Sequence, residues 1–195
     1  MPRRASEKNN TVRTFICIEI PASISERIAN LQTALKAIDA QVSWTSPSNI
    51  HLTLKFLGAV DATRIPKVTK ALQRASAGIS PFEIEVSGAG CFPSPRGPRV
   101  LWIGLSEVPD ALKQLSANLE DELAREGFAR EKRKFSPHLT IGRLRGPKNA
   151  TQLAEALIAT GFGAEAFKAT QVIVMRSDLR PTGSVYTPQA VIKLA

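Results

Sequence analysis

The chain contains few of the residues that usually hold metals or form disulfides. Its 195 residues include two cysteines, Cys17 and Cys91, and two histidines, His51 and His138. Two thiols are too few for a disulfide framework, and the cytoplasm is the default location for such a chain. Two histidines without a helical His-x-x-x-His spacing or a carboxylate cluster are too few for a zinc site. We therefore expect no metal site, and we expect Cys17, in an apolar strand pattern, to be buried.

Long apolar runs and acidic residues are also scarce. No stretch approaches the roughly 20 apolar residues of a membrane helix, so no membrane partner is expected. Residues 1–12 are largely polar and lack the apolar core of a signal peptide, which predicts a disordered tail. The chain has 26 Lys and Arg against 17 Asp and Glu, a net charge of +9. A basic surface attracts polyanions, of which nucleic acid is the commonest.

Residues 13–195 are expected to form one domain in which the same order of elements occurs twice. Apolar periodicity predicts strand, helix, histidine strand, helix and strand in each half. The first half contains strands at 13–20, 50–57 and 82–86, a helix that Pro21 and Ser23 open and whose apolar spacing runs from Ile24 to Ile38, and a helix at 63–77. Gly58 ends the histidine strand, and residues 91–98 form a loop. The second half contains strands at 100–105, 137–143, 167–175 and 185–193 and helices at 109–126 and 151–160. The helix at 109–126 should carry an apolar stripe of Leu112, Leu115, Leu119 and Leu123 on one face.

A constant offset relates the two halves. His51 and His138 are 87 residues apart, and so are Phe15 and Trp102 in the two opening strands. This offset indicates an internal repeat, roughly 13–98 and 99–195. We expect an α+β fold of two pseudo-symmetric lobes of largely antiparallel sheet with outer helices, and an active-site cleft between the lobes.

The histidines occur in two nearly identical tetrapeptides, His51-Leu52-Thr53-Leu54 and His138-Leu139-Thr140-Ile141. On a strand, side chains alternate between faces, so each histidine shares a face with its threonine. Two facing copies would bring together a base, an acid and two hydroxyl donors, which suits in-line transfer at phosphorus.

A structural role is the ordinary interpretation of a single His-x-Thr, and a duplication could have copied the motif without a function. Buried polar side chains are costly unless paired, however, and this argues against two unused copies. A Ser-His-Asp triad is disfavoured, because no nucleophile elbow is present and one histidine would be idle.

At these residues the sequence resembles the 2H phosphoesterase superfamily, and in particular its RNA 2′,3′-cyclic phosphodiesterases, also named 2′-5′ RNA ligases. The resemblance covers nearly the whole chain after the tail. It rests on the segments 13–15, 44–58, 99–102, 135–143 and 177–186.

The resemblance implies hydrolysis of a 2′,3′-cyclic phosphate at an RNA or nucleotide end to a 2′-phosphate, without a metal or any other cofactor. We expect the enzyme to act as a monomer. It makes His138 the general base and His51 the general acid, although the near symmetry of the site leaves their order open. Thr53 and Thr140 would bind the non-bridging oxygens, and Arg143 would contact the phosphate.

Three assignments have rival interpretations. Phe56 matches a residue that stacks on the terminal base, but strict alternation puts it on the core face with Leu52 and Leu54. Arg143 could instead be a solvated strand end. The basic run before the second motif is either a solvated loop or a contact to the RNA backbone. It comprises Arg130, Lys132, Arg133 and Lys134.

Other functions remain open at this point. The chain could be an RNA-binding module without turnover, or a 2H enzyme for another small cyclic phosphate such as ADP-ribose 1″,2″-cyclic phosphate. Ligation through 2′-5′ bonds is hydrolysis with an RNA hydroxyl in place of water, so we expect at most a weak reverse activity.

Overall fold

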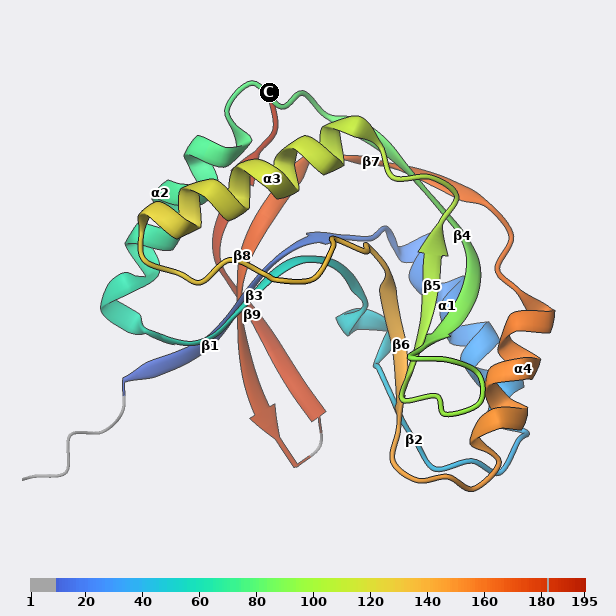
Figure 1. Ribbon diagram of the computed structural model, residues 1–195. Helices are drawn as coiled ribbons and strands as arrows, with labels where there is room; N and C mark the ends of the chain where they lie inside the picture. Colours follow the sequence, from blue (N-terminus) through green and yellow to red (C-terminus); the bar gives the residue numbers. More distant parts are fainter. Residues whose placement is uncertain (1–9, 182) are drawn as a thin grey trace, which may run out of the picture.

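The computed structural model describes residues 10–181 and 183–195 (Figure 1). Within these residues, nine antiparallel strands form one sheet in the order β7-β4-β5-β6-β3-β1-β8-β9, with β2 added beside β6. This confirms the expected α+β fold with a largely antiparallel sheet. In chain order the elements are β1 (Thr11–Glu19), α1 (Ala22–Leu35), β2 (Val42–Trp44), η1 (Pro47–Asn49), β3 (His51–Asp61), η2 (Ala62–Arg64), α2 (Ile65–Ser76), β4 (Phe82–Phe92), β5 (Val100–Leu105), α3 (Asp110–Arg125), β6 (Leu139–Leu144), α4 (Ala150–Thr160), β7 (Glu165–Ala169), β8 (Gln171–Arg180) and β9 (Gly183–Lys193).

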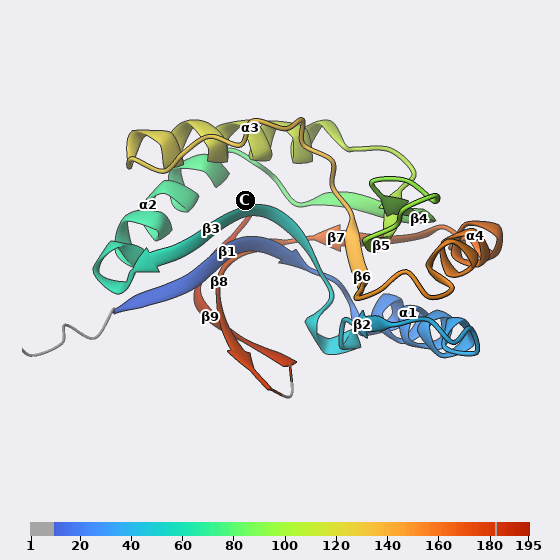
Figure 2. The ribbon, with the colours of Figure 1, turned by 60° about the horizontal axis from the view of Figure 1, so that its bottom comes forward.

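The sheet is sharply curved, and its helices lie in two pairs on the outside. Helices α2 and α3 pack together over the β3-β1-β8-β9 half, and α1 and α4 lie on the β7-β4-β5-β6 half (Figures 1 and 2). The apolar stripe predicted for α3 is fully buried, and each such leucine contributes about 1.5–3 kcal/mol to folding. It consists of Leu112, Leu115, Leu119 and Leu123.

Each half of the sheet draws strands from both halves of the sequence. β4, from the first half of the chain, pairs with β5 from the second. β8, from the second half, pairs with β1 from the first. The two spatial lobes are therefore interleaved along the chain, and the repeat over 13–98 and 99–195 stays a prediction about sequence.

The lobes join where the two motif strands cross. β3 and β6 meet antiparallel in a single backbone pair, Leu52 with Leu139. Beyond this pair the two strands diverge, and the long β8–β9 hairpin projects from the sheet (Figure 2).

Several element boundaries differ from those predicted. β1 begins at Thr11, inside the expected tail, of which residues 1–9 lie outside the described residues. Gly58 does not end the first motif strand. It has φ +70°, a conformation that favours glycine, and β3 continues to Asp61. β4 extends to Phe92 and so includes part of the expected loop.

The C-terminal region also differs. Residues 167–175 divide between two strands. The first part belongs to β7, which pairs with β4, and the second part belongs to β8, which pairs with β1. β2 was not predicted at all. The predicted turn at 181–183 includes Thr182, which lies outside the described residues. None of the helices in residues 10–181 and 183–195 is long and apolar enough to cross a membrane.

Candidate active site

The two His-x-Thr motifs lie around the point where β3 and β6 meet. In the antiparallel register set by Leu52 and Leu139, the residues that flank this pair are His51 and Thr140 on one side and Thr53 and His138 on the other. Leu52 and Leu139 are fully buried on the core face, whereas the histidines and threonines are half-buried on the other face. Period-two alternation thus holds within each tetrapeptide, and the register brings all four polar side chains to one face.

A β-bulge follows each motif, at equivalent positions. In β3, Thr53 pairs with Cys17 and Lys55 with Ile16, so that Leu54 is the extra residue. In β6, Thr140 pairs with Trp102 and Gly142 with Leu101, so that Ile141 is the extra residue. Leu54 and Ile141 are 87 residues apart, the same offset as the histidines.

The bulges reverse the alternation beyond each motif. Phe56 is therefore on the cleft face with 67% of its surface exposed, and the expectation of core packing for it is wrong. Arg143, at the equivalent position of β6, is also exposed and lines the cleft. Phe15 of β1 pairs with Phe56, and Val100 of β5 pairs with Arg143, the position equivalent to Phe56. Phe15 therefore corresponds to Val100, 85 residues later, and not to Trp102, 87 residues later. Phe15 and Trp102 are thus not structurally equivalent.

Both imidazoles are held by the same hydrogen bond. Nδ1 of His51 lies 2.8 Å from the Asn49 carbonyl oxygen, and Nδ1 of His138 lies 2.7 Å from the Ser136 carbonyl oxygen. A carbonyl only accepts, so Nδ1 carries the proton in both rings. Nε2 is then the titrating nitrogen of each ring, and each ring orientation is fixed by the backbone two residues earlier.

Burial favours the neutral form of both histidines. Desolvation lowers the pKa of His51 below its usual value, against an opposing effect of the bond to Asn49. Desolvation also lowers the pKa of His138, and the positive charge of Arg143 lowers it further. Both rings are therefore set to be neutral near pH 7 and to accept a proton at Nε2.

Aromatic rings surround each histidine. His51 stacks on Phe15, with ring centroids 4.6 Å apart and planes 22° apart, and meets the edge of Tyr186 at 5.4 Å. His138 meets Phe92 at 5.0 Å and lies 6.5 Å from Trp102. Trp102 in turn requires Gly90 beside it, because a Cβ there would lie 2.4 Å from the indole ring. Trp102 is therefore packed closely against β4, beside Phe92 and His138.

A cleft of about 430 Å³ opens on this face. Its lining includes one histidine and both threonines of the motifs, His51, Thr53 and Thr140, together with Phe56 and Arg143. His138 belongs to the same face by register but is not among the lining residues. The hairpin supplies the opposite wall, with Ser177, Leu179, Ser184 and Tyr186.

The charge of the cleft has one sign. Three guanidinium groups line it, those of Arg13, Arg143 and Arg145, and none of the lining residues is an Asp or Glu. Within the described part of the chain none of the three forms an ion pair, whereas Arg176, on the neighbouring strand, is paired with Asp178. An open cleft lined by unpaired cations attracts anions.

Two buried polar side chains hold the bulged strands. Gln32, 2% exposed on α1, donates to the carbonyl of Ile141 at 2.8 Å, the residue that the bulge removes from the regular ladder. Lys55, 7% exposed, donates to Glu120 on α3 at 2.6 Å and to the Ala129 carbonyl at 2.9 Å. Lys55 thus ties the first motif strand to the segment leading to the second motif.

The basic run before the second motif does not line the cleft. Arg130 pairs with Asp121 of α3 at 2.7 Å, and Arg133 lies 3.4 Å from Glu131. These residues and their neighbours, Lys132 and Lys134, are exposed. This run therefore has the contacts of a solvated loop along α3.

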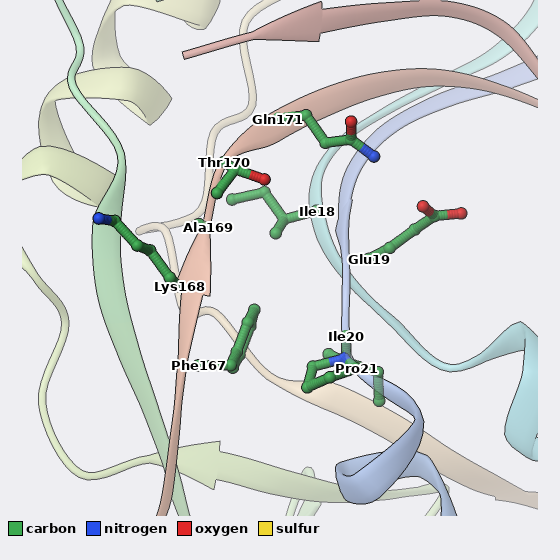
Figure 3. Close-up of a pocket in the computed structure, with 9 residues that line it drawn as sticks. All are labelled: Ile18, Glu19, Ile20, Pro21, Phe167, Lys168, Ala169, Thr170 and Gln171. Atoms are coloured by element: carbon green, nitrogen blue, oxygen red, sulfur yellow. The ribbon is translucent and has the colours of Figure 1, made fainter. Parts of the chain in front are cut away.

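A second hollow, of about 300 Å³, lies where the end of β1 faces the β7–β8 connection (Figure 3). Ile18 and Phe167 lie between the strands, and the charged side chains of Glu19 and Lys168 point away from each other. Neither histidine lines it. In residues 10–181 and 183–195, no group of three or more His, Cys, Asp or Glu side chains is placed to hold a metal ion.

Sequence reasoning missed several residues of the cleft. Asn49 donates through Nδ2 to the Ser184 carbonyl at 2.7 Å and so joins the hairpin to the residue that orients His51. Tyr186 and Leu179 come from strands more than 120 residues after the first motif. Only Arg145 carried a local signal, since it lies two residues beyond Arg143 and shares its face.

Comparison with known proteins places the chain in a family. The model of the LigT-like phosphoesterases matches it twice in succession, at residues 18–102 and 103–186. The RNA 2′,3′-cyclic phosphodiesterase of Methanothermobacter thermautotrophicus is 37% identical over 185 residues, 94% of this chain and 99% of that protein. The Thermotoga maritima protein of the same name is 34% identical over 176 residues, 90% of this chain and 91% of its own.

Solved structures agree with the sequence matches. Escherichia coli LigT in complex with 3′-AMP superposes with a TM-score of 0.76 at 26% identity, covering 94% of this chain and 98% of that one. The MHV ns2 PDE domain, at 12% identity and a TM-score of 0.54, shares the fold. Family model, relatives and fold cover the same residues, and the chain belongs to the LigT-like phosphoesterase family.

Proposed function

We propose that the protein is an RNA 2′,3′-cyclic phosphodiesterase that hydrolyses the cyclic phosphate to a 2′-phosphate. The observation that carries the proposal is the matched pair of histidines, each held through Nδ1 by a carbonyl two residues earlier. A pair of oriented Nε2 atoms on one face supplies the base and the acid that cyclic phosphate hydrolysis requires. The relatives' printed names supply the substrate class.

The reaction proceeds by in-line attack of water on phosphorus. One Nε2 takes a proton from the attacking water, and the other imidazole, protonated at Nε2, donates its proton to O3′ as the P–O3′ bond breaks. The 2′-phosphate remains on the ribose. Thr53 and Thr140 donate hydroxyl hydrogen bonds to the non-bridging oxygens, whose charge increases in the transition state, and Arg143 contacts the same group.

The surroundings of the rings favour His138 as base and His51 as acid. The charge of Arg143 disfavours protonation of His138, which keeps a lone pair available on Nε2. His51 stacks on Phe15, and an imidazolium is attracted to an aromatic face. Since burial lowers the pKa of both rings, the negative charge of the bound cyclic phosphate must raise the pKa of the ring that acts as acid.

Phe56 is placed to stack on the terminal base. It is exposed in the cleft next to Phe15, with ring centroids 5.9 Å apart. Adenine nucleotides occupy related structures, since E. coli LigT was crystallised with 3′-AMP and with ATP. The site needs no resident metal or cofactor for this chemistry, because the residues named supply both proton transfers and the anion contacts.

The test is incubation with a panel of cyclic phosphates. It contains the four nucleoside 2′,3′-cyclic phosphates, an oligoribonucleotide with a 2′,3′-cyclic end, and ADP-ribose 1″,2″-cyclic phosphate. The proposal predicts 2′-phosphate products from the RNA and nucleoside substrates. A 3′-phosphate product would contradict the proposed leaving group. Turnover of the ADP-ribose compound alone would make the chain a 2H enzyme of another specificity, and binding of the RNA without product would make it a binding module.

A further inference from the structure

Arg143 and Arg145 lie side by side at one end of the cleft, and only Arg143 is used by the proposed reaction. They are separated by one residue on β6 and its extension, so both project to the same face about 6.6–6.8 Å apart along the chain. Both line the cleft. The main-chain N–H of Arg145 donates to the Gln41 carbonyl at 2.8 Å, which continues the pairing with β2 past Leu144.

Arg145 is held in place rather than extended into solvent. Its Nε donates to the Ser43 hydroxyl oxygen at 2.7 Å. Ser43 pairs with Arg143 across β2 and β6, so this bond draws the Arg145 guanidinium back along the strand toward Arg143. The terminal nitrogens of Arg145 keep their donors, and no carboxylate among the described residues pairs with them.

Two like charges held close together without an acidic partner repel each other unless an anion lies between or beside them. Arginine presents a rigid fork of donors that matches a phosphate, and fixing Nε in advance reduces the entropy lost on binding. The spacing of two residues along a strand is comparable with the separation of successive phosphates along a single nucleic acid strand.

On this geometry, and resting on the proposed function, we infer that Arg145, positioned by Ser43, binds the phosphate on the 5′ side of the terminal nucleotide. Arg143 then contacts the cyclic phosphate and Arg145 contacts the next phosphate of the chain. The enzyme consequently prefers a cyclic phosphate at the end of an RNA chain to the same group on a free nucleoside.

The experiment uses three substrates that differ in one feature at a time. The first is adenosine 2′,3′-cyclic phosphate, the second is the same compound carrying a 5′-phosphate, and the third is a triadenylate with a 2′,3′-cyclic end. Wild type should show kcat/KM rising from the first to the second and third. Loss of one charged hydrogen-bond pair should make Arg145→Ala lower kcat/KM for the second and third about tenfold more than for the first.

Two further variants separate position from charge. Ser43→Ala keeps the Arg145 charge but removes the acceptor for Nε, so it should reduce the same preference by about two- to threefold. Lys67→Ala changes the net charge equally on the outer face of α2, far from the cleft, and should leave the kinetics of all three substrates unchanged. Circular dichroism of each variant checks that the fold is retained.

The contrary outcomes are distinct. An equal loss by Arg145→Ala on all three substrates would place Arg145 at the reacting phosphate, and a loss on the triadenylate alone would indicate a base or sugar contact. No loss on any would remove the subsite, and each of these results overturns the inference. If wild type hydrolysed none of the three, the proposed function would fail, and calorimetric binding of the same compounds to wild type and Arg145→Ala would still decide the inference.

Discussion

The ion pair of Lys55 is the most exacting test of how the motif strands are held. Lys55 follows the bulge residue of β3, and its ammonium group bonds Glu120 at 2.6 Å and the Ala129 carbonyl at 2.9 Å. The exposed fractions of the two charged side chains are 6% and 22%. Lys55→Met keeps most of the apolar stem. Among the described residues, it leaves Glu120 with the bond from the Glu131 N–H, at 3.0 Å, as its one remaining side-chain hydrogen bond.

The expected cost follows from these contacts. Removing one partner of a buried pair costs about 3–5 kcal/mol, and the partial exposure of Glu120 reduces this to about 2–3 kcal/mol. Urea unfolding, followed by circular dichroism, measures this as a lower midpoint at unchanged slope. Glu120→Gln should cost less, because its amide oxygen still accepts from Lys55.

The control for this measurement is Lys67→Met on the exposed face of α2, which should stay within about 0.5 kcal/mol of wild type. If Lys55→Met were as stable as Lys67→Met, the pair would not hold β3 to α3. The account of how the bulged strand is anchored would then be wrong.

Three further predictions concern the site. Folding lowers the pKa of both histidines, so their neutral forms contribute to the free energy of unfolding fully above pH 6.5, and this contribution is lost as the pH falls through the lowered pKa values. Urea midpoints measured against pH should show this loss. The double variant His51→Gln/His138→Gln should show less of it. Phe56→Ala should raise KM by about tenfold through lost base stacking, with little change in stability since the ring is exposed, and an unchanged KM would contradict the stacking role. Hydrolysis should survive dialysis against EDTA, whereas a loss that zinc restores would indicate a metal enzyme.

Much of the site could be predicted because it obeys simple periodicities. Alternation placed His51 with Thr53 and His138 with Thr140, and the single pair between Leu52 and Leu139 makes the two motifs adjacent. Helical spacing identified the buried stripe of α3. These features depend on local sequence, which is what pattern reasoning reads.

The bulges could not be predicted from alternation, because one extra residue reverses every side chain that follows. That is why strict alternation alone put Phe56 on the core face, whereas its ring is exposed in the cleft. The buried Gln32 gave no signal either, since its partners are the main-chain carbonyls of Thr45 and Ile141. These carbonyls come close to Gln32 only in the folded chain, and the sequence does not show this.

The interleaving of the lobes was also beyond the sequence. β4 and β8 each cross to the lobe of the other half, so a repeat in sequence does not correspond to a lobe in space. Tyr186 reaches His51 only through this crossing. Long-range strand pairing depends on the whole chain, and the local pattern of β8 carries no information about its neighbour.

The most direct test of the central claim is the single-turnover rate of His51→Ala, His138→Ala and the double variant on a nucleoside 2′,3′-cyclic phosphate. The account holds that both rings act in one composite site. Each single variant should therefore lose about 10² to 10⁴ in rate with its fold retained, and the double variant should lose less than the product of the two. Full activity in either single variant would show that one motif suffices and would contradict the account.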